Sequence, residues 1–255
     1  MKILLVNDDG IYAEGLLKMA GALAKNDFVE KIMIVAPSKE QSGMSQALTM
    51  GVPLRVKQIK ADELNLKDVL AYSVDGTPAD CTKLALEVLL KEKPDLIISG
   101  INNGGNLGTD VLYSGTVGAG LEGYNHGVPA ICVSVGHERS IKMEEIAQII
   151  SDNIKRFYQS DKLFMYNINF PSELKNGKVK FVFTKQGRRY YDNEFDIVKL
   201  EDNCCAYQMQ GRAKDIGNDE YTDIETVKKG FISITPLSLE RTDFAKLEEL
   251  MKSDF

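Results

Sequence analysis

The chain of 255 residues has little of what several large protein classes depend on. Its four cysteines, Cys81, Cys132, Cys204 and Cys205, contain no Cys-x-x-Cys pair. This pattern indicates neither a disulfide framework nor a cysteine-based zinc site, and it fits a reducing compartment. Cys132 lies within an apolar run, and we expect it to be a small core residue.

Long hydrophobic runs and an excess of positive charge are also missing. The apolar residues 3–6 are too few for a signal-peptide core, and no apolar run is long enough to span a bilayer. The formal net charge is −6, which gives no basic footprint for bulk nucleic acid. We therefore expect a cytoplasmic protein without membrane or bulk nucleic-acid partners. A small anionic substrate would need a local cation to offset the negative charge.

Histidine is scarce, with only His126 and His137 in the chain. A Ser-His-Asp triad would need one of them, and the chain has no Gly-x-Ser-x-Gly elbow to present a nucleophilic serine. We interpret both histidines as surface or capping residues. Serine-based nucleophilic catalysis is therefore disfavoured.

Apolar residues are present in the amount that a large core requires, at 44% of the chain. In the first part of the chain, short apolar runs alternate with amphipathic stretches. The expected strands are residues 3–6, 32–35, 69–74, 96–99 and 130–135, and the expected helices are residues 15–25, 77–91 and 142–158. This alternation predicts an α/β fold with a parallel sheet and helices on both faces.

The pattern changes beyond about residue 165, where no long helices separate the apolar runs. The expected elements there are strands at residues 165–169, 179–184, 204–210 and 231–235, a short helix at 223–229 and a terminal helix at 243–251. We interpret this part as an extension rich in β-hairpins. A projecting hairpin has little core of its own, so its expected use is subunit contact.

Two aspartates, Asp8 and Asp9, directly follow the first expected strand and precede Gly10. In an open α/β sheet, ligands bind at the carboxyl ends of the strands. Adjacent carboxylates repel each other, and a divalent cation such as Mg²⁺, Mn²⁺ or Ca²⁺ is a common reason to keep them together. The residues alone leave a plain turn and helix cap as an equal alternative.

Three further segments follow expected strands. Residues 36–53, which include Ser42, form a long stretch with little periodicity, and such loops are often functional. Residues 99–109 are rich in glycine and place the neutral oxygen ligand Asn102 after a buried strand. Ser114-Gly115-Thr116 begins a helix of small residues, whose free N–H groups and dipole suit an anion. Plain loops and a simple N-cap remain open alternatives.

The order and spacing of these motifs, together with Asp-Gly-Thr-Pro-Ala-Asp-Cys at residues 75–81, resemble the SurE (survival protein E) family. Thr-Lys-Gln-Gly-Arg at 184–188 and Gly-Phe-Ile-Ser-Ile-Thr-Pro at 230–236 extend the resemblance over essentially the whole chain. It implies a Rossmann-like, three-layer α/β/α core over residues 1–165 with a mostly parallel sheet. It also implies a hairpin and helix extension over residues 166–255, exchanged between the subunits of a homodimer or homotetramer.

The resemblance further implies a metal-dependent phosphatase that binds one divalent cation, Mg²⁺ or Mn²⁺, per subunit. The implied metal ligands are Asp8, Asp9, Ser42 and Asn102, and the implied phosphate-binding residues are Ser114, Gly115 and Thr116. Asp8, Asp9 and Asn102 are the candidate catalytic residues. Asp9 is also the candidate base that activates the attacking water.

The expected reaction is hydrolysis of nucleoside 5′-monophosphates to nucleoside and phosphate, with 3′-nucleotides and polyphosphate as further possible substrates. Two alternatives stay open. One is a nucleotide sensor without turnover, whose basic Arg188-Arg189 arm contacts a partner. The other is a phosphatase with an aspartyl-phosphate intermediate, although such enzymes usually carry Asp-x-Asp after the first strand.

Overall fold

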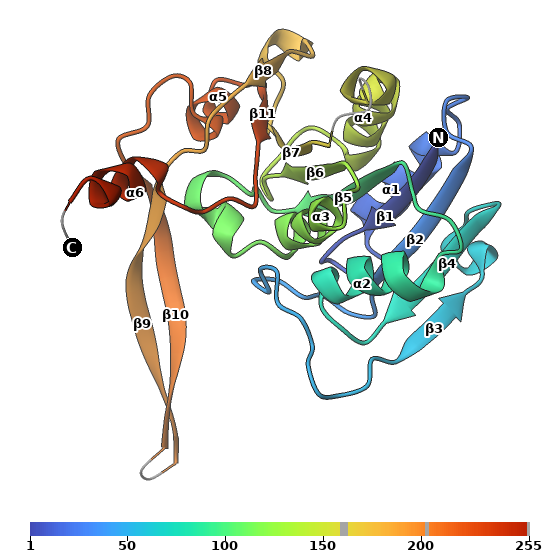
Figure 1. Ribbon diagram of the computed structural model, residues 1–255, viewed down its shortest axis with the longest axis horizontal. Coiled ribbons are helices and arrows are strands. Elements are labelled where there is room, and N and C mark those ends of the chain that lie inside the picture. The colour runs from blue at the N-terminus through green and yellow to red at the C-terminus, as the bar shows by residue number, and fades with distance from the viewer. Residues whose placement is uncertain (159–162, 202–203, 254–255) are drawn as a thin grey trace.

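A mixed, mostly parallel sheet forms the centre of the computed structural model, which describes residues 1–158, 163–201 and 204–253 (Figure 1). In spatial order its strands are β3 (Val56–Ile59), β4 (Val69–Val74), β2 (Lys31–Pro37), β1 (Lys2–Val6), β5 (Leu96–Asn103), β6 (Ala130–Val135), β7 (Met165–Phe170), β11 (Ile232–Pro236) and β8 (Phe181–Phe183). Among the described strands of this sheet, β3 pairs antiparallel with β4 and β11 with β7, and the other pairs are parallel. The predicted α/β class with a mostly parallel sheet is confirmed.

Strand β1 lies in the middle of the sheet, between β2 and β5. All of its side chains except that of Lys2 are buried, as is typical of a strand covered on both faces. Leu4 pairs with Met33 on one side and with Ile97 on the other. Successive side chains of a strand point to opposite faces, so Leu5 and Leu4 belong to two different cores. This central position fixes where the chain leaves the sheet at Asn7.

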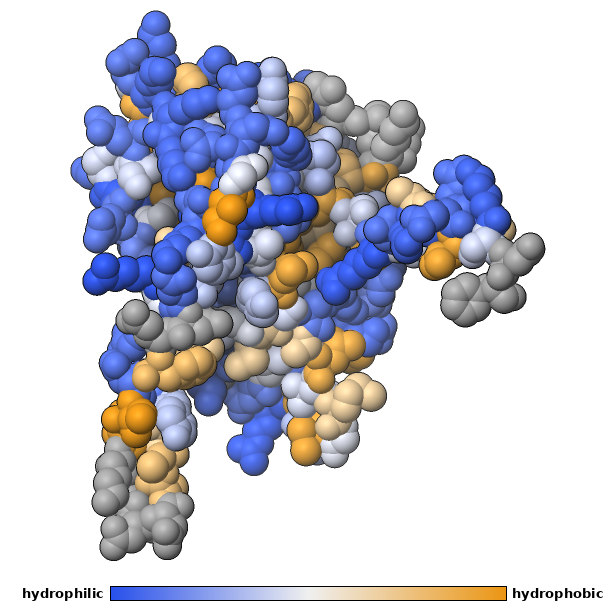
Figure 2. Space-filling view, turned by 90° about the vertical axis from the view of Figure 1, so that its left-hand side faces the viewer, coloured by the Kyte–Doolittle hydropathy of each residue, from blue (hydrophilic) through white to orange (hydrophobic). Residues whose placement is uncertain are grey.

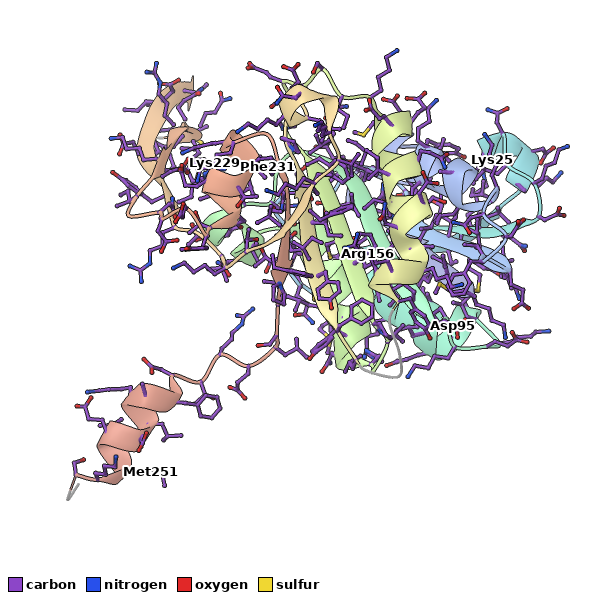
Figure 3. All side chains as sticks on the ribbon, turned by 90° about the horizontal axis from the view of Figure 1, so that it is seen from above. Lys25, Asp95, Arg156, Lys229, Phe231 and Met251 are labelled. Atoms are coloured by element: carbon purple, nitrogen blue, oxygen red, sulfur yellow. The ribbon has the colours of Figure 1, made fainter. Side chains whose placement is uncertain are left out.

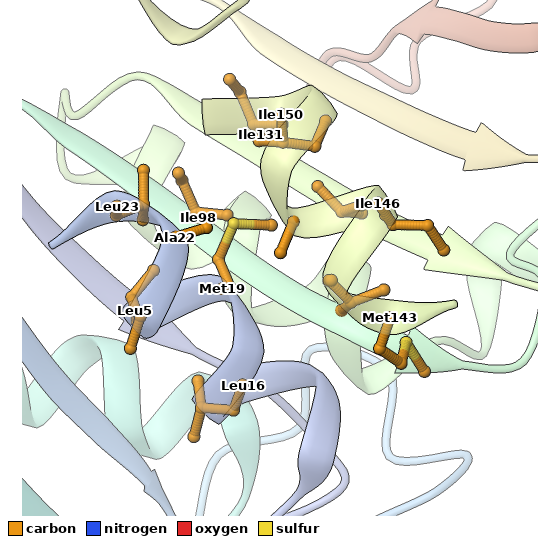
Figure 4. Close-up of a cluster of buried hydrophobic side chains, with 14 of the residues drawn as sticks. Leu5, Leu16, Met19, Ala22, Leu23, Ile98, Ile131, Met143, Ile146 and Ile150 are labelled. Carbon is orange, nitrogen blue, oxygen red and sulfur yellow. The ribbon is translucent and has the colours of Figure 1, made fainter. Parts of the chain in front are cut away.

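Helices cover both faces of the sheet (Figure 1). Helices α1 (Glu14–Leu23) and α4 (Met143–Phe157) pack on one face, where Leu16, Met19 and Ile146 meet Leu5 and Ile98 (Figure 4). Helices α2 (Pro78–Leu84) and α3 (Gly115–Asn125) cover the other. As expected, Cys132 is a buried residue of this second core.

Helix α2 begins as the sequence predicts but ends differently. Thr77 caps it by accepting a hydrogen bond from the N–H of Asp80, and Pro78 occupies the first helical position. At Ala85 the helix widens into a π-helical segment, Ala85–Leu89, in which the N–H of Leu90 reaches the carbonyl of Ala85. The regular helix is therefore shorter than residues 77–91.

The glycine-rich segment is partly strand, which the sequence pattern did not indicate. Strand β5 continues to Asn103, and Asn102 and Asn103 pair with Ser134 and Val135 of β6. The pairing register shifts between Gly100 and Asn102. Asn102 is thus held by a neighbouring strand rather than by a free loop.

A long two-stranded arm projects from the body and is formed by β9 (Arg189–Glu201) and β10 (Cys204–Asp215) (Figure 1). Hydrophobic side chains gather along it (Figure 2). Exposed large apolar residues on the arm are Tyr190, Tyr191, Phe195, Ile197, Val198, Tyr207 and Met209. The predicted hairpin is present, and its first strand is one that the sequence pattern did not define.

The remaining elements of the second half are divided between the sheet and the exterior. Strands β7, β11 and β8 complete the central sheet, with α5 (Asp223–Lys228) packed beside β11. Helix α6 (Phe244–Met251) has no buried residue and extends away from the body (Figure 3). The boundary at residue 165 stays a prediction. Within the described residues, no helix is both long and apolar enough to cross a membrane.

Two glycines of α1 provide a test of how tightly this helix packs on the end of β5. A Cβ atom on Gly15 would lie 2.0 Å from the carbonyl oxygen of Ile101, whereas one on Gly21 would meet nothing within 4 Å. We expect Gly15→Ala to lower the free energy of unfolding by about 3 kcal/mol through overpacking. Gly21→Ala should raise it by about 0.5–1 kcal/mol through helix propensity. Urea unfolding measures both, and equal effects would contradict this packing.

Candidate active site

A tight turn holds the two aspartates at the carboxyl end of β1. The side chain of Asn7 is fully buried, donates to the carbonyl of Gly10 (2.8 Å) and accepts from its N–H (3.3 Å). Gly10 has a φ of +104°, which glycine adopts readily. This closed turn fixes the directions in which Asp8 and Asp9 leave the strand.

Asp8 lies beneath the first turn of α3 and is only 5% exposed. The hydroxyl of Thr116 donates to its Oδ1 at 2.5 Å. A Cβ atom on Gly115 would lie 2.9 Å from the Cβ of Asp8 and 3.1 Å from its Oδ2. Glycine at this position is therefore what lets the helix terminus approach the carboxylate.

Burial governs the protonation of both aspartates. Desolvation raises the pKa of Asp8 to about 6, while the Thr116 hydroxyl lowers it and the charge of Asp9 raises it further. Desolvation also raises the pKa of Asp9. The N–H of Asn103 donates to Oδ2 of Asp9 at 3.2 Å and lowers this pKa. Positive charge near this pair would favour the ionised form of both carboxylates.

Asn102 directly precedes Asn103, whose N–H reaches Asp9. The Nδ2 of Asn102 donates to the carbonyl of Gly104 at 2.7 Å, so the amide nitrogen is engaged within the loop and Oδ1 is the atom left for a ligand. The next side chain, Asn103, accepts from Nη1 of Arg139 at 2.6 Å. The predicted ligands Asp8, Asp9 and Asn102 thus come from the ends of two adjacent strands.

The loop that carries Ser42 is attached to Asp8 through the backbone. The N–H of Gln41 donates to the carbonyl of Asp8 at 2.8 Å, whereas the hydroxyl of Ser42 donates to Oε1 of Glu40 at 2.7 Å. Farther along, Thr49 donates from its N–H and its hydroxyl to the buried Asp80. Within the described structure, Ser42 lies next to the site without a hydrogen bond to either aspartate.

The three residues of the predicted phosphate turn are buried at the start of α3. Ser114 is the N-cap, and its Oγ accepts from the N–H of Val117 at 3.0 Å, which leaves its hydroxyl hydrogen for another acceptor. The hydroxyl hydrogen of Thr116 is directed to Asp8 instead. The turn therefore combines a helix terminus of the kind that suits an anion with a threonine that holds a carboxylate.

Two residues near Asp9 were not identified from the sequence. The charge of Glu40 raises the pKa of Asp9, and His137 lowers it. Glu40 lies two residues before Ser42, and His137 follows β6, which ends at the same edge as β5. Their positions after strands that end at this edge could have identified both residues from the sequence. His126, by contrast, caps the C-terminus of α3, as expected.

A buried polar network, also not foreseen, fixes the glycine-rich loop after β5. The carbonyl of Asn106 accepts from the side chains of Asn167 and Asn169, and its N–H donates back to Asn169. The side chain of Asn106 donates to Ser134. The two asparagines alternate along the buried strand β7, and this alternation of polar residues was the signal in the sequence. Farther on, the buried Asp223 accepts from the N–H of Gly108.

This donor set fits a hard divalent cation. Asp8, Asp9, Asn102 and Ser42 offer only oxygen atoms, which Mg²⁺, Mn²⁺ and Ca²⁺ prefer. Among the described residues, no three His, Cys, Asp or Glu side chains are grouped so as to hold a metal ion. A cation here would consequently depend on neutral oxygens besides the two carboxylates.

The fold is an α/β protein in which oxygen-bearing side chains of Asp8, Asp9 and Asn102 follow strand ends beside the N-terminus of α3. The model of the family "Survival protein SurE" matches residues 3–193, about three quarters of the chain. The chain belongs to the SurE family.

Relatives and a solved structure match over nearly the full length. A protein of Caldanaerobacter subterraneus subsp. tengcongensis named 5′-nucleotidase SurE is 40% identical, over 97% of this chain and 95% of its own. A protein of Desulforudis audaxviator with the same name is 42% identical over 99% and 97%. The crystal structure of the SurE protein from Aquifex aeolicus is similar with a TM-score of 0.79, at 33% identity and 98% coverage of both chains.

The raised pKa of Asp8 predicts a specific dependence of stability on pH without divalent metal. Because folding raises the pKa from 3.8 to about 6, the folded chain binds more protons than the unfolded chain between these values. The free energy of unfolding of the protein should therefore fall as the pH rises from 4 to 7. Asp8 should account for about 3 kcal/mol of this decrease. Asp8→Asn keeps an oxygen for Thr116 and should remove this decrease. Urea unfolding with a chelator, at several pH values, measures it, and parallel curves for both proteins would contradict the assignment.

Proposed function

We propose that this protein is a divalent-metal-dependent phosphomonoesterase that hydrolyses nucleoside 5′-monophosphates to nucleoside and phosphate. The observation that carries the proposal is the contact between Asp8 and the first turn of α3. It places a carboxylate suited to a cation directly beside an N-terminus suited to a phosphate. Relatives with the name 5′-nucleotidase that match over the full length support the nucleotide as the substrate.

Asp8, Asp9 and Asn102 would hold one Mg²⁺ or Mn²⁺, and Ser42 would join them by turning its hydroxyl away from Glu40. When bound, such a cation supplies neutralisation of the phosphoryl charge and activation of water as the nucleophile. The backbone bond from Gln41 to Asp8 keeps Ser42 near enough for this exchange. Among the described residues, no positively charged group contributes to the raised pKa of Asp8, so a bound cation would supply the positive charge that ionises this carboxyl.

The chain's own groups bind and orient the phosphoryl group. The hydroxyl of Ser114 and the N–H of Gly115 donate to phosphoryl oxygens, where negative charge accumulates as water attacks. Thr116 acts indirectly: its hydroxyl donates to Asp8 and holds the orientation of that carboxylate. Asp9, which is less buried than Asp8, is the group we assign to accept the proton of the attacking water.

The arm and α6 are the surfaces we assign to a second copy of the chain. Both expose large apolar side chains, such as Phe195 on the arm and Phe244 on α6. Contiguous apolar surface of this kind marks protein interaction sites. A cytoplasmic homodimer or homotetramer is the assembly that we propose.

Asp8→Asn tests the assigned role of this carboxylate. We expect phosphate release from nucleoside 5′-monophosphates, measured with added Mg²⁺ or Mn²⁺, to fall at least about 100-fold because a charged cation ligand is lost. Asp27→Asn changes an exposed aspartate away from the site and should keep full activity. Circular dichroism must show that both variants fold.

The outcomes of this assay separate the alternatives. Near-wild-type turnover by Asp8→Asn would overturn the assignment. Nucleotide binding without phosphate release by the unmodified chain would identify a sensor. A phosphorylated aspartate trapped on the protein would instead indicate covalent catalysis. Running the assay over 5′-nucleotides, 3′-nucleotides and polyphosphate defines the substrate range.

A further inference from the structure

A cavity of about 720 Å³ lies at the same edge of the sheet as the aspartates. Its walls come from the loop after β5, the residues that follow β6 and β7, and α5. The lining residues that matter for its chemistry are Gly105, Leu107, Gly136, Lys175, Ile224 and Lys229. This volume is typical of a site for a small organic molecule. None of the predicted site residues lines it.

The cavity begins where the candidate active site ends. A Cβ atom on Gly104 would lie 3.3 Å from both Nδ2 of Asn102 and Nε2 of His137, and the next residue, Gly105, lines the cavity. On the other side, Gly136 lines the cavity, and the next residue is this same His137 beside Gly104. Two backbone segments therefore border both places.

The separation matches the length of a nucleotide. Strands β1, β5 and β6 are consecutive neighbours in the sheet. Neighbouring strands lie about 4.8 Å apart, so the end of β6 is about 10 Å from that of β1. A phosphate held by Ser114 beside Asp8 would leave the sugar and base of the same molecule to extend toward Gly136.

The lining suits a flat, weakly polar ring with oxygen atoms at its edge. Leu107, Phe170 and Ile224 form an apolar floor and are each at most 9% exposed. Lys175 and Lys229 lie on the exposed rim. Within the described part of the chain, neither lysine has a carboxylate within 4.0 Å, whereas the lining residues Arg189 and Lys228 are paired with Asp215. The ammonium of Lys175 lies over the ring of Phe231, 5.0 Å from its centroid, and this contact leaves its N–H donors for a ligand.

We propose that this cavity binds the nucleoside half of the substrate. The base lies on Leu107 and Ile224, and the sugar occupies the passage between Gly105 and Gly136. Lys175 and Lys229 donate to oxygen atoms of the base or sugar. This inference rests on the proposed hydrolysis of nucleoside monophosphates and assigns the residues that distinguish a nucleotide from other phosphomonoesters.

The first test fills the cavity. A Cβ atom on Gly136 would meet only Oγ of Ser172, at 3.8 Å, so Gly136→Leu can be accommodated by the fold. Gly21→Leu, in open space on α1, is the matched control. We expect Gly136→Leu to raise the KM for nucleoside 5′-monophosphates at least about tenfold, since binding contacts are lost. Its kcat/KM for glycerol phosphate, which has no base, should stay within about twofold of wild type.

The second test removes the two lysine side chains at the rim of the cavity. The double variant Lys175→Ala, Lys229→Ala should raise the KM for nucleotides and leave kcat unchanged, because it removes binding that the ground state and the transition state share. Lys25→Ala is the control, since Lys25 is exposed on the opposite side of the molecule from Lys229 (Figure 3). Loss of activity on both substrates in equal proportion, or an unchanged nucleotide KM in both test variants, would overturn the proposal.

Calorimetric titration with adenosine and guanosine separates this proposal from the proposed function. We expect the unmodified chain to bind a nucleoside and Gly136→Leu to lose that binding, whether or not phosphate is released. Absence of hydrolysis with nucleoside binding retained would refute the nucleotidase and support the subsite. Hydrolysis of nucleotides with nucleoside affinity unchanged by Gly136→Leu would refute the subsite alone.

Discussion

The burial of the Asp8 carboxylate is the constraint on which the site depends. A carboxylate taken out of water is costly to ionise unless hydrogen bonds or positive charge compensate. Here Thr116 supplies one hydrogen bond, and Gly115 lets the helix terminus come close enough to act. The packing of α3 against the end of β1 is therefore set by one polar contact as much as by apolar side chains.

Other buried carboxylates in the chain serve a different purpose. Asp80 accepts hydrogen bonds from Thr49 and the N–H of Thr77, and Asp223 accepts from the N–H groups of Gly108 and Gly187. Each of them joins loops that are distant in sequence. Asp8 differs because it lies beside a second carboxylate at a sheet edge where ligands bind. Burial of a carboxylate therefore supports structure at Asp80 and Asp223 and, in our proposal, chemistry at Asp8.

The sequence was sufficient for the class of fold and for placing the candidate site residues at one sheet edge. Buried strands are short apolar runs, so the residues that follow them could be assigned to one sheet edge, and Asp8, Asp9 and Asn102 do lie there. Tertiary partners were not readable in this way. The bond from Thr116 to Asp8 joins residues 108 positions apart, and Ser42 donates to Glu40 because of loop geometry. The asparagine network of β7 likewise depends on a loop folding over it.

The central claim is that one divalent cation binds between Asp8, Asp9 and Asn102. The most direct measurement is the anomalous difference map of a crystal of this protein soaked in Mn²⁺. We expect one peak per chain within coordination distance of oxygen atoms of both aspartates and of Asn102, absent in crystals of Asp8→Asn. A map without a peak at this position, or with Mn²⁺ bound only elsewhere, would contradict the account.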